Sequence, residues 1–234
     1  MKLPTFDASG AKLRTIFALA IVLAQFGDVA HAGEVNLGPG LSPEVVEQFA
    51  TPYTEVSVRE DVNVVRLFFL PSCPYCRLAH STVVRWGETL PKAIRFETTP
   101  VVTRDRAAML SAAAYYAAAA MNPAAAGRYV DALYAELQDR HAPAGDVATY
   151  LSVAKATGYE PRRFYAAMAS DESKKKVRKA GLLASTYKLT STPSVTMGGR
   201  FVVTPESSQG VNSAFYDLLN AVMSKYLIET GGMR

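Results

Sequence analysis

The 234-residue sequence has few cysteines and few histidines: two of the first, Cys73 and Cys76, and three of the second. Two cysteines allow at most one disulfide, so a disulfide-dense scaffold is excluded, and residues this close would close too small a loop to stabilise a fold. The few histidines leave little material for a metal site, and we expect no metal and no cofactor. The net charge of +4 is too small to indicate nucleic acid as a partner. The two cysteines are therefore candidates for chemistry.

The first 32 residues have the pattern of a secretory signal peptide. Basic residues within 2–14 precede an apolar run over 16–26, and Ala30-His31-Ala32 gives a small-x-small cleavage site. The apolar run is too short to span a bilayer comfortably, although an uncleaved membrane anchor is the alternative. We predict cleavage after Ala32 and export to the periplasm. Thiols oxidise readily outside the cytoplasm, so a C-x-x-C pair there is expected to cycle with a disulfide.

The rest of the chain gives the order strand–helix–strand, then a block of helices, then a hairpin and a last helix. The β-branched and aromatic run over 62–70 suits a strand buried on both faces. Gly198-Gly199 between two short apolar runs indicates a two-residue hairpin. We predict strands over 62–70, 94–102, 193–197 and 200–204, and helices over 42–49, 75–90, 105–121, 123–140, 146–157, 160–169, 170–188 and 212–229.

This order predicts an α/β protein in which an all-helical domain is inserted into a sheet domain. No convincing strand pattern occurs between residues 105 and 188. We therefore place the sheet domain at 33–103 and 189–234, and the helical insertion at 104–188.

The motif Cys73-Pro74-Tyr75-Cys76 follows the first predicted strand and opens a predicted helix. At a helix N-terminus, free backbone N–H groups and the helix dipole favour a thiolate at Cys73 by roughly 0.3–2 kcal/mol. Pro74 suits the first helical turn, and Cys76 lies one turn further on, within reach of a disulfide. We expect Cys73 to be exposed and nucleophilic, and Cys76 to be shielded. Structural zinc would need four ligands; after cleavage the chain offers the two cysteines and two distant histidines, so we expect no structural zinc site.

Other residues near the motif and later in the chain have weaker patterns. Arg77 is interpreted as a solvated helix residue, and His80 as a packed or surface histidine on the same helix. The lysine-rich run over 173–179 is interpreted as a solvated helix face. The Thr192-Pro193 bond, at the start of a predicted strand, could be cis or trans, since X-Pro bonds adopt cis at modest cost. A cis loop beside Cys73 would expose backbone to an extended substrate.

Together these features resemble the DsbA family of exported, thioredoxin-fold thiol–disulfide oxidoreductases. The resemblance covers roughly residues 60–225 and rests on the C-x-x-C motif after a buried strand, the helical insertion, Thr192-Pro193, and the segment GGRFVVTP over 198–205. The insertion is too long for a plain thioredoxin or glutaredoxin. The resemblance implies a thioredoxin fold with an inserted all-helical domain.

By that resemblance Cys73 is the catalytic nucleophile and Cys76 the resolving cysteine. Pro193 is the implied cis-proline, with Thr192 before it in the substrate-binding loop. The implied activity is disulfide donation: a client thiolate attacks Cys73, a mixed disulfide forms, and a second client thiol releases the reduced enzyme. The implied partners are client proteins with reduced cysteines and a quinone-linked membrane protein that reoxidises the pair.

Three features depart from the best-known oxidases of that family. Pro74-Tyr75 replaces their Pro-His and is typical of glutaredoxins and of an exported isomerase-like branch. Thr192 is also closer to that branch, since the oxidases tend to have valine there. The acidic residue that some oxidases bury six positions before the nucleophile would fall at Leu67. Against an isomerase, too few residues precede the first strand for an N-terminal dimerisation domain, so we expect a monomer.

Two alternative functions therefore stay open. The first is a disulfide reductase or isomerase on the same fold, which a redox titration would separate from an oxidase. The second is a non-catalytic module that binds copper(I) through the two thiolates or serves only in interactions. Tight, stoichiometric metal uptake without exchange activity would indicate the second.

Overall fold

A computed structural model describes residues 43–231 of the chain. All of them belong to one compact unit, Val35–Arg234. The other unit, Met1–Glu34, lies outside the described residues, and with it the predicted signal peptide. Among residues 43–231, no helix combines the length and apolar character needed to cross a membrane.

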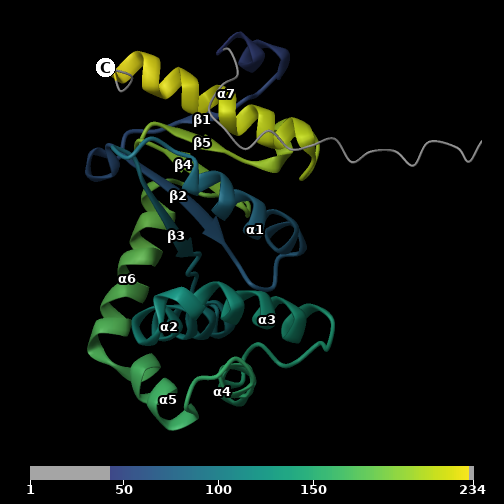
Figure 1. The fold of residues 1–234 in the computed structure, drawn as a ribbon, viewed down its shortest axis with the longest axis vertical. Helices are drawn as coiled ribbons and strands as arrows, with labels where there is room; N and C mark the ends of the chain where they lie inside the picture. Colours follow the sequence, from purple (N-terminus) through teal and green to yellow (C-terminus); the bar gives the residue numbers. More distant parts are fainter. Residues whose placement is uncertain (1–42, 232–234) are drawn as a thin grey trace, which may run out of the picture. The chain divides into compact units, whose positions relative to one another are not determined.

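Five strands form one mixed sheet in the order β1-β5-β4-β2-β3 (Figure 1). β2 pairs with β3 in parallel and with β4 antiparallel, so it lies inside the sheet. All six of its residues are buried, as the sequence pattern predicted. The carboxyl end of β2 carries the chain straight into the C-x-x-C motif. The strand bounds are β1 Thr54–Glu55, β2 Val64–Phe69, β3 Arg95–Pro100, β4 Ser194–Met197 and β5 Phe201–Val203.

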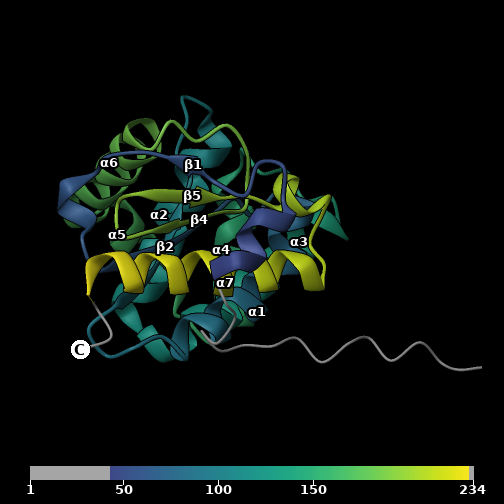
Figure 2. The ribbon, with the colours of Figure 1, turned by 90° about the horizontal axis from the view of Figure 1, so that it is seen from above.

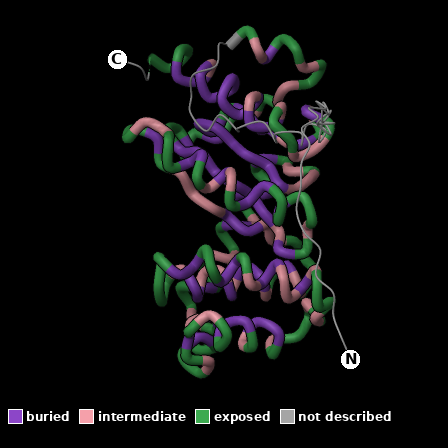
Figure 3. Tube along the Cα trace, turned by 45° about the vertical axis from the view of Figure 1, so that its right-hand side comes forward, coloured by how far each residue is buried: buried purple, intermediate pink, exposed green. Residues whose placement is uncertain are grey.

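Two helices cover one face of the sheet, and a third covers the other (Figures 1 and 2). α1 (Pro74–Glu88) and α7 (Ser213–Thr230) bury one large apolar cluster against β2, β4 and β5. Trp86 Nε1 donates a hydrogen bond to Asn220 Oδ1 at 2.8 Å and links these two helices. In Figure 3 the buried stretches lie along the strands and the inner sides of the helices. This packing fixes the start of α1 against the end of β2.

The helices between β3 and β4 build an apolar cluster of their own. Tyr129, Tyr150 and Phe164 are fully buried in it. Side-chain caps begin four of these helices; in two of them, Asp105 accepts a hydrogen bond from the Ala108 N–H, and Ser170 from the Ser173 N–H. The bounds are α2 Arg106–Met121, α3 Ala126–Gln138, α4 Val147–Ala156, α5 Pro161–Ala169 and α6 Asp171–Thr186. α6 returns the chain to the second face of the sheet.

The glycine hairpin between β4 and β5 is confirmed. Gly198 and Gly199 have φ of 59° and 65°, the left-handed region that side chains disfavour. A Cβ at Gly198 would lie 2.0 Å from the Tyr226 ring, and one at Gly199 would lie 2.0 Å from the Val58 carbonyl oxygen. Both positions therefore require glycine for conformation and for space.

The sheet also buries a charge that the apolar pattern did not predict. The Arg66 side chain, on β2, is only 5% exposed. Its Nε and Nη2 donate to the two carboxylate oxygens of Asp61 at 2.6 and 2.7 Å, and its Nη1 donates to Glu97. Tyr187 Oη donates to Asp61 at 2.6 Å. This network ties β2 and β3 to the chain that follows α6.

A few predicted elements differ in detail from the structure. The segment predicted as a helix over 42–49 is a 3₁₀ helix, η1 (Pro43–Gln48), and the helix predicted from 123 starts with a 3₁₀ turn, η3 (Pro123–Ala125). β1 was not predicted, because two exposed residues carry no alternation. Two further 3₁₀ turns, η2 (Arg59–Asp61) and η4 (Pro205–Ser208), flank the sheet.

Candidate active site

Cys73 is the N-cap residue of α1, as the sequence predicted. Its backbone is extended, with φ −87° and ψ 119°, and its Sγ accepts a hydrogen bond from the Cys76 backbone N–H at 3.3 Å. Pro74 occupies the first helical position, where no N–H is needed. Both cysteines are free thiols; Cys73 is half-buried and Cys76 is fully buried. The start of α1 therefore gives the Cys73 sulfur a backbone hydrogen-bond donor, and the protein interior shields the Cys76 sulfur from solvent.

The two sulfurs have opposite acidities. A hydrogen bond from the Cys76 side chain is the main factor that lowers the pKa of Cys73 to about 6; burial opposes it, and hydrogen bonds from Thr192 and from backbone N–H groups add to it. Burial raises the pKa of Cys76 far above that of a free thiol. At pH 7, Cys73 is therefore mostly thiolate, while Cys76 keeps its proton.

The Thr192-Pro193 loop lies directly beside Cys73. Its peptide bond is cis, the geometry that the family resemblance implied. The Cys73 Sγ lies 3.1 Å from the Thr192 carbonyl oxygen, and the protonated thiol donates to it. Residues 119 positions apart in the sequence are thus brought into contact at one site.

A groove of about 370 Å³ runs beside this loop. Tyr75, a residue that is 56% exposed, lies on one side of it. Ser191 and Thr192 line it beside the cysteine pair, and the segment around η4 closes the far side. The groove therefore borders Thr192, the residue whose carbonyl oxygen contacts the Cys73 sulfur.

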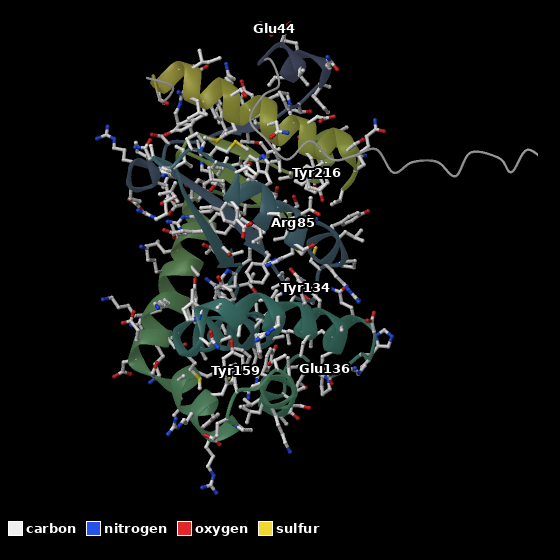
Figure 4. All side chains as sticks on the ribbon, viewed as in Figure 1. Glu44, Arg85, Tyr134, Glu136, Tyr159 and Tyr216 are labelled. Atoms are coloured by element: carbon white, nitrogen blue, oxygen red, sulfur yellow. The ribbon has the colours of Figure 1, made fainter. Side chains whose placement is uncertain are left out.

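Behind the pair lies a buried polar contact. His80, one turn after Cys76 on α1, has Nδ1 at 3.1 Å from the hydroxyl of Tyr134, and both rings pack against Phe69. Figure 4 labels Tyr134 on the side of α3 towards the sheet. Burial lowers the pKa of His80 to about 4, so the imidazole is neutral at pH 7. The interpretation of His80 as a packed histidine is confirmed.

Acidic and metal-binding groups are sparse around the pair. Leu67, the position at which the family resemblance implied an acid in some oxidases, is fully buried among apolar side chains. Within residues 43–231, no three His, Cys, Asp or Glu side chains gather at a point that could hold a metal ion.

The carboxyl end of α3 contacts the active-site loop, which the sequence did not predict. Gln138 Nε2 donates to the carbonyl oxygens of Pro71 at 2.9 Å and Cys73 at 3.1 Å. Beside it, Arg77 forms a two-pronged ion pair with Asp139 at 2.5 and 2.8 Å, so the exposed arginine is not only solvated. A glutamine at a helix end 65 residues from Cys73 gives no sequence signal of this contact.

The lysine-rich run lies on α6, away from the contacts of the cysteine pair. Lys174 pairs with Asp171 at 3.0 Å, and Lys176 lies 3.8 Å from Glu172. These exposed pairs agree with the interpretation of a solvated helix face, and the structure links none of them to Cys73.

Comparison with known proteins points to one family. The family model "DSBA-like thioredoxin domain" matches residues 80–215, a span that begins four residues after Cys76. No curated protein matches the sequence. Among solved structures, DsbA from Pseudomonas aeruginosa is similar with a TM-score of 0.68 and 19% identity, covering 78% of this chain and 94% of its own.

Two further solved structures show the same fold. The oxidoreductase DsbA from Xylella fastidiosa has a TM-score of 0.62 and 22% identity, and covers 78% of this chain and 96% of its own. A DsbA variant from Proteus mirabilis, solved with the peptide PWATCDS bound non-covalently, has a TM-score of 0.64 and 16% identity, with 77% and 97% covered. The thioredoxin-like sheet with inserted helices, predicted from the sequence, is confirmed.

Proposed function

Because the chain belongs to the family of DSBA-like thioredoxin domains, we propose that it is a thiol–disulfide oxidoreductase that donates its Cys73–Cys76 disulfide to client proteins. One observation carries this proposal. A half-buried cysteine with a pKa of about 6 lies at a helix start, one turn before a fully buried cysteine whose pKa is raised. That asymmetry suits a nucleophile and its resolving partner.

The proposed reaction runs in two exchanges. A client thiolate attacks the Cys73 sulfur of the disulfide; the S–S bond breaks, and Cys76 leaves with the electron pair and takes up a proton, since its pKa is raised. A second client thiolate then attacks the client sulfur of the mixed disulfide, and Cys73 leaves as a stable thiolate. Two electrons pass from the client dithiol to the pair, and the client gains a disulfide.

The proposed direction is supported by which form of the protein the helix start stabilises. Helix N–H groups stabilise the Cys73 thiolate, which exists only in the reduced protein. Stabilising the reduced form makes the disulfide a stronger oxidant. Tyr75 and Thr192 are typical of the isomerase-like branch and favour the reductase or isomerase alternative. The reduction potential therefore decides between that alternative and the proposed oxidase.

We propose that the groove beside Thr192 takes an extended client segment with its cysteine near Cys73. The Proteus mirabilis DsbA variant was solved with a cysteine-containing peptide bound non-covalently, which supports a peptide segment as the ligand of this chain. By the same family argument we propose periplasmic location, a monomer, and reoxidation by a quinone-linked membrane partner. The basic, then apolar, N-terminal pattern supports export.

A redox titration tests the proposed direction. Equilibration with glutathione buffers, followed by quantification of free Cys73 and Cys76, should give a potential more oxidising than about −180 mV. A value near about −270 mV, that of a reductant such as thioredoxin, would instead favour the reductase alternative. Copper(I) taken up stoichiometrically by the reduced protein, with no exchange of a dithiol peptide, would favour the binding module.

A further inference from the structure

The contact between α3 and the active-site loop involves two backbone carbonyl groups, those of Pro71 and Cys73. Gln138 uses its side-chain amide to donate to Pro71 O at 2.9 Å and to Cys73 O at 3.1 Å. The glutamine is partly buried, and it belongs to the inserted helices rather than to the sheet. One neutral side chain thus joins the insertion to both ends of a three-residue loop.

That loop sets where the Cys73 sulfur lies. The Cys73 N–H donates to Leu70 O at 2.9 Å, and the Cys73 carbonyl also accepts the first helical bond, from the Arg77 N–H, at 3.2 Å. With both carbonyls held, the Cys73 backbone keeps the extended N-cap conformation that directs Sγ back towards the Cys76 N–H. A loop free to rotate would lengthen that 3.3 Å contact.

We propose that Gln138 is a positioning residue: its amide holds the Pro71–Cys73 loop so that the Cys73 sulfur stays against the start of α1 and remains a reactive thiolate. The inference rests on the proposed function only in taking Cys73 as the nucleophile. It gives the inserted helices a direct part in setting the redox properties of the pair. A glutamine suits this role because it donates two hydrogen bonds without placing a negative charge beside a thiolate.

The chain offers a graded set of variants. Gln138→Met keeps the size of the side chain and removes both donors. Gln138→Glu keeps the shape but replaces the donors with a carboxylate that faces the same two carbonyl oxygens. Glu136→Gln, labelled in Figure 4 on the same helix, removes an exposed ion pair with Arg140 and serves as the control.

The readout is the Cys73 pKa, followed by thiolate ultraviolet absorbance of the reduced protein against pH, with thermal unfolding measured in parallel. We expect Gln138→Met to raise the Cys73 pKa by about one half to one unit, Gln138→Glu to raise it further, and Glu136→Gln to leave it unchanged. The reduction potentials should become less oxidising in the same order.

An unchanged Cys73 pKa in Gln138→Met, with or without a lower melting temperature, would overturn the inference and leave the residue a purely structural role. A raised pKa in a protein that shows no disulfide exchange would support the positioning role while contradicting the proposed function. The positioning role of Gln138 and the proposed function can therefore be contradicted independently of each other.

Discussion

Cys73→Ser is expected to abolish oxidation of a dithiol peptide, leaving only the uncatalysed rate. A serine at this position cannot form the disulfide with Cys76 that the client thiolate attacks, and its hydroxyl is not ionised near neutral pH, so the helix start holds no reactive sulfur. Cys76→Ser should behave differently: its Cys73 thiolate still attacks the disulfide of an oxidised client peptide, one client sulfur leaves as a thiol, and a mixed disulfide forms. No buried thiol then resolves it, and protein–client adducts accumulate. Non-reducing electrophoresis and mass spectrometry of the adducts distinguish the two variants.

Ser81→Ala, on an exposed position of the same helix, is the matched control and should keep full activity. If Cys73→Ser oxidised the peptide at the rate of the parent protein, the assignment of Cys73 as the nucleophile would be wrong. Equal adduct yields from both cysteine variants would contradict the division of roles between the two sulfurs.

Arg66→Met is expected to lower the free energy of unfolding by about 3–5 kcal/mol, because it leaves Asp61 buried without its cation. Arg95 provides the comparison, since it pairs with the same Glu97 but is 65% exposed. Arg95→Met should cost less than about 1 kcal/mol, as exposed ion pairs usually do. Denaturant unfolding at pH 7 measures both, and equal losses would contradict the importance of the buried network.

The same network predicts how stability depends on pH. Burial alone would raise the pKa of Asp61 and of Glu97, but hydrogen bonds and charge from arginines hold both below their ordinary values. Carboxyls with a depressed pKa in the folded state stabilise the fold above about pH 4, and this contribution is lost as the pH falls further. Carboxyls usually titrate between about pH 5 and about pH 3. Over that range, the free energy of unfolding of Arg66→Met should therefore fall by less than that of the parent protein.

The local features of this molecule could be predicted from sequence because their causes are local. Three neighbouring features suffice to place Cys73 at a helix start: the buried apolar run before it, the C-x-x-C motif itself, and the proline that directly follows Cys73. The hairpin followed from two adjacent glycines, which the chain requires at left-handed positions. Helix boundaries agreed wherever a capping residue marks them, as Ser170 does before α6.

Contacts between distant segments could not be predicted in the same way. Arg66 lies within an otherwise apolar strand, and its partners come from a 3₁₀ turn, a neighbouring strand and the chain after α6. The contact of Gln138 with the Cys73 loop likewise depends on how the insertion packs. The cis state of Thr192-Pro193 was left undecided by the residues, since both isomers are accessible, and came only from the family resemblance.

The most direct test of the account is the pH dependence of alkylation of the reduced protein by iodoacetamide, with each cysteine followed by peptide mass spectrometry. The account predicts that Cys73 is modified first, with a rate that reaches half its maximum near pH 6, while Cys76 stays protected. A Cys73 rate that rises only around pH 8.5, as for a free cysteine at roughly that pKa, would contradict it, as would equal modification of both residues.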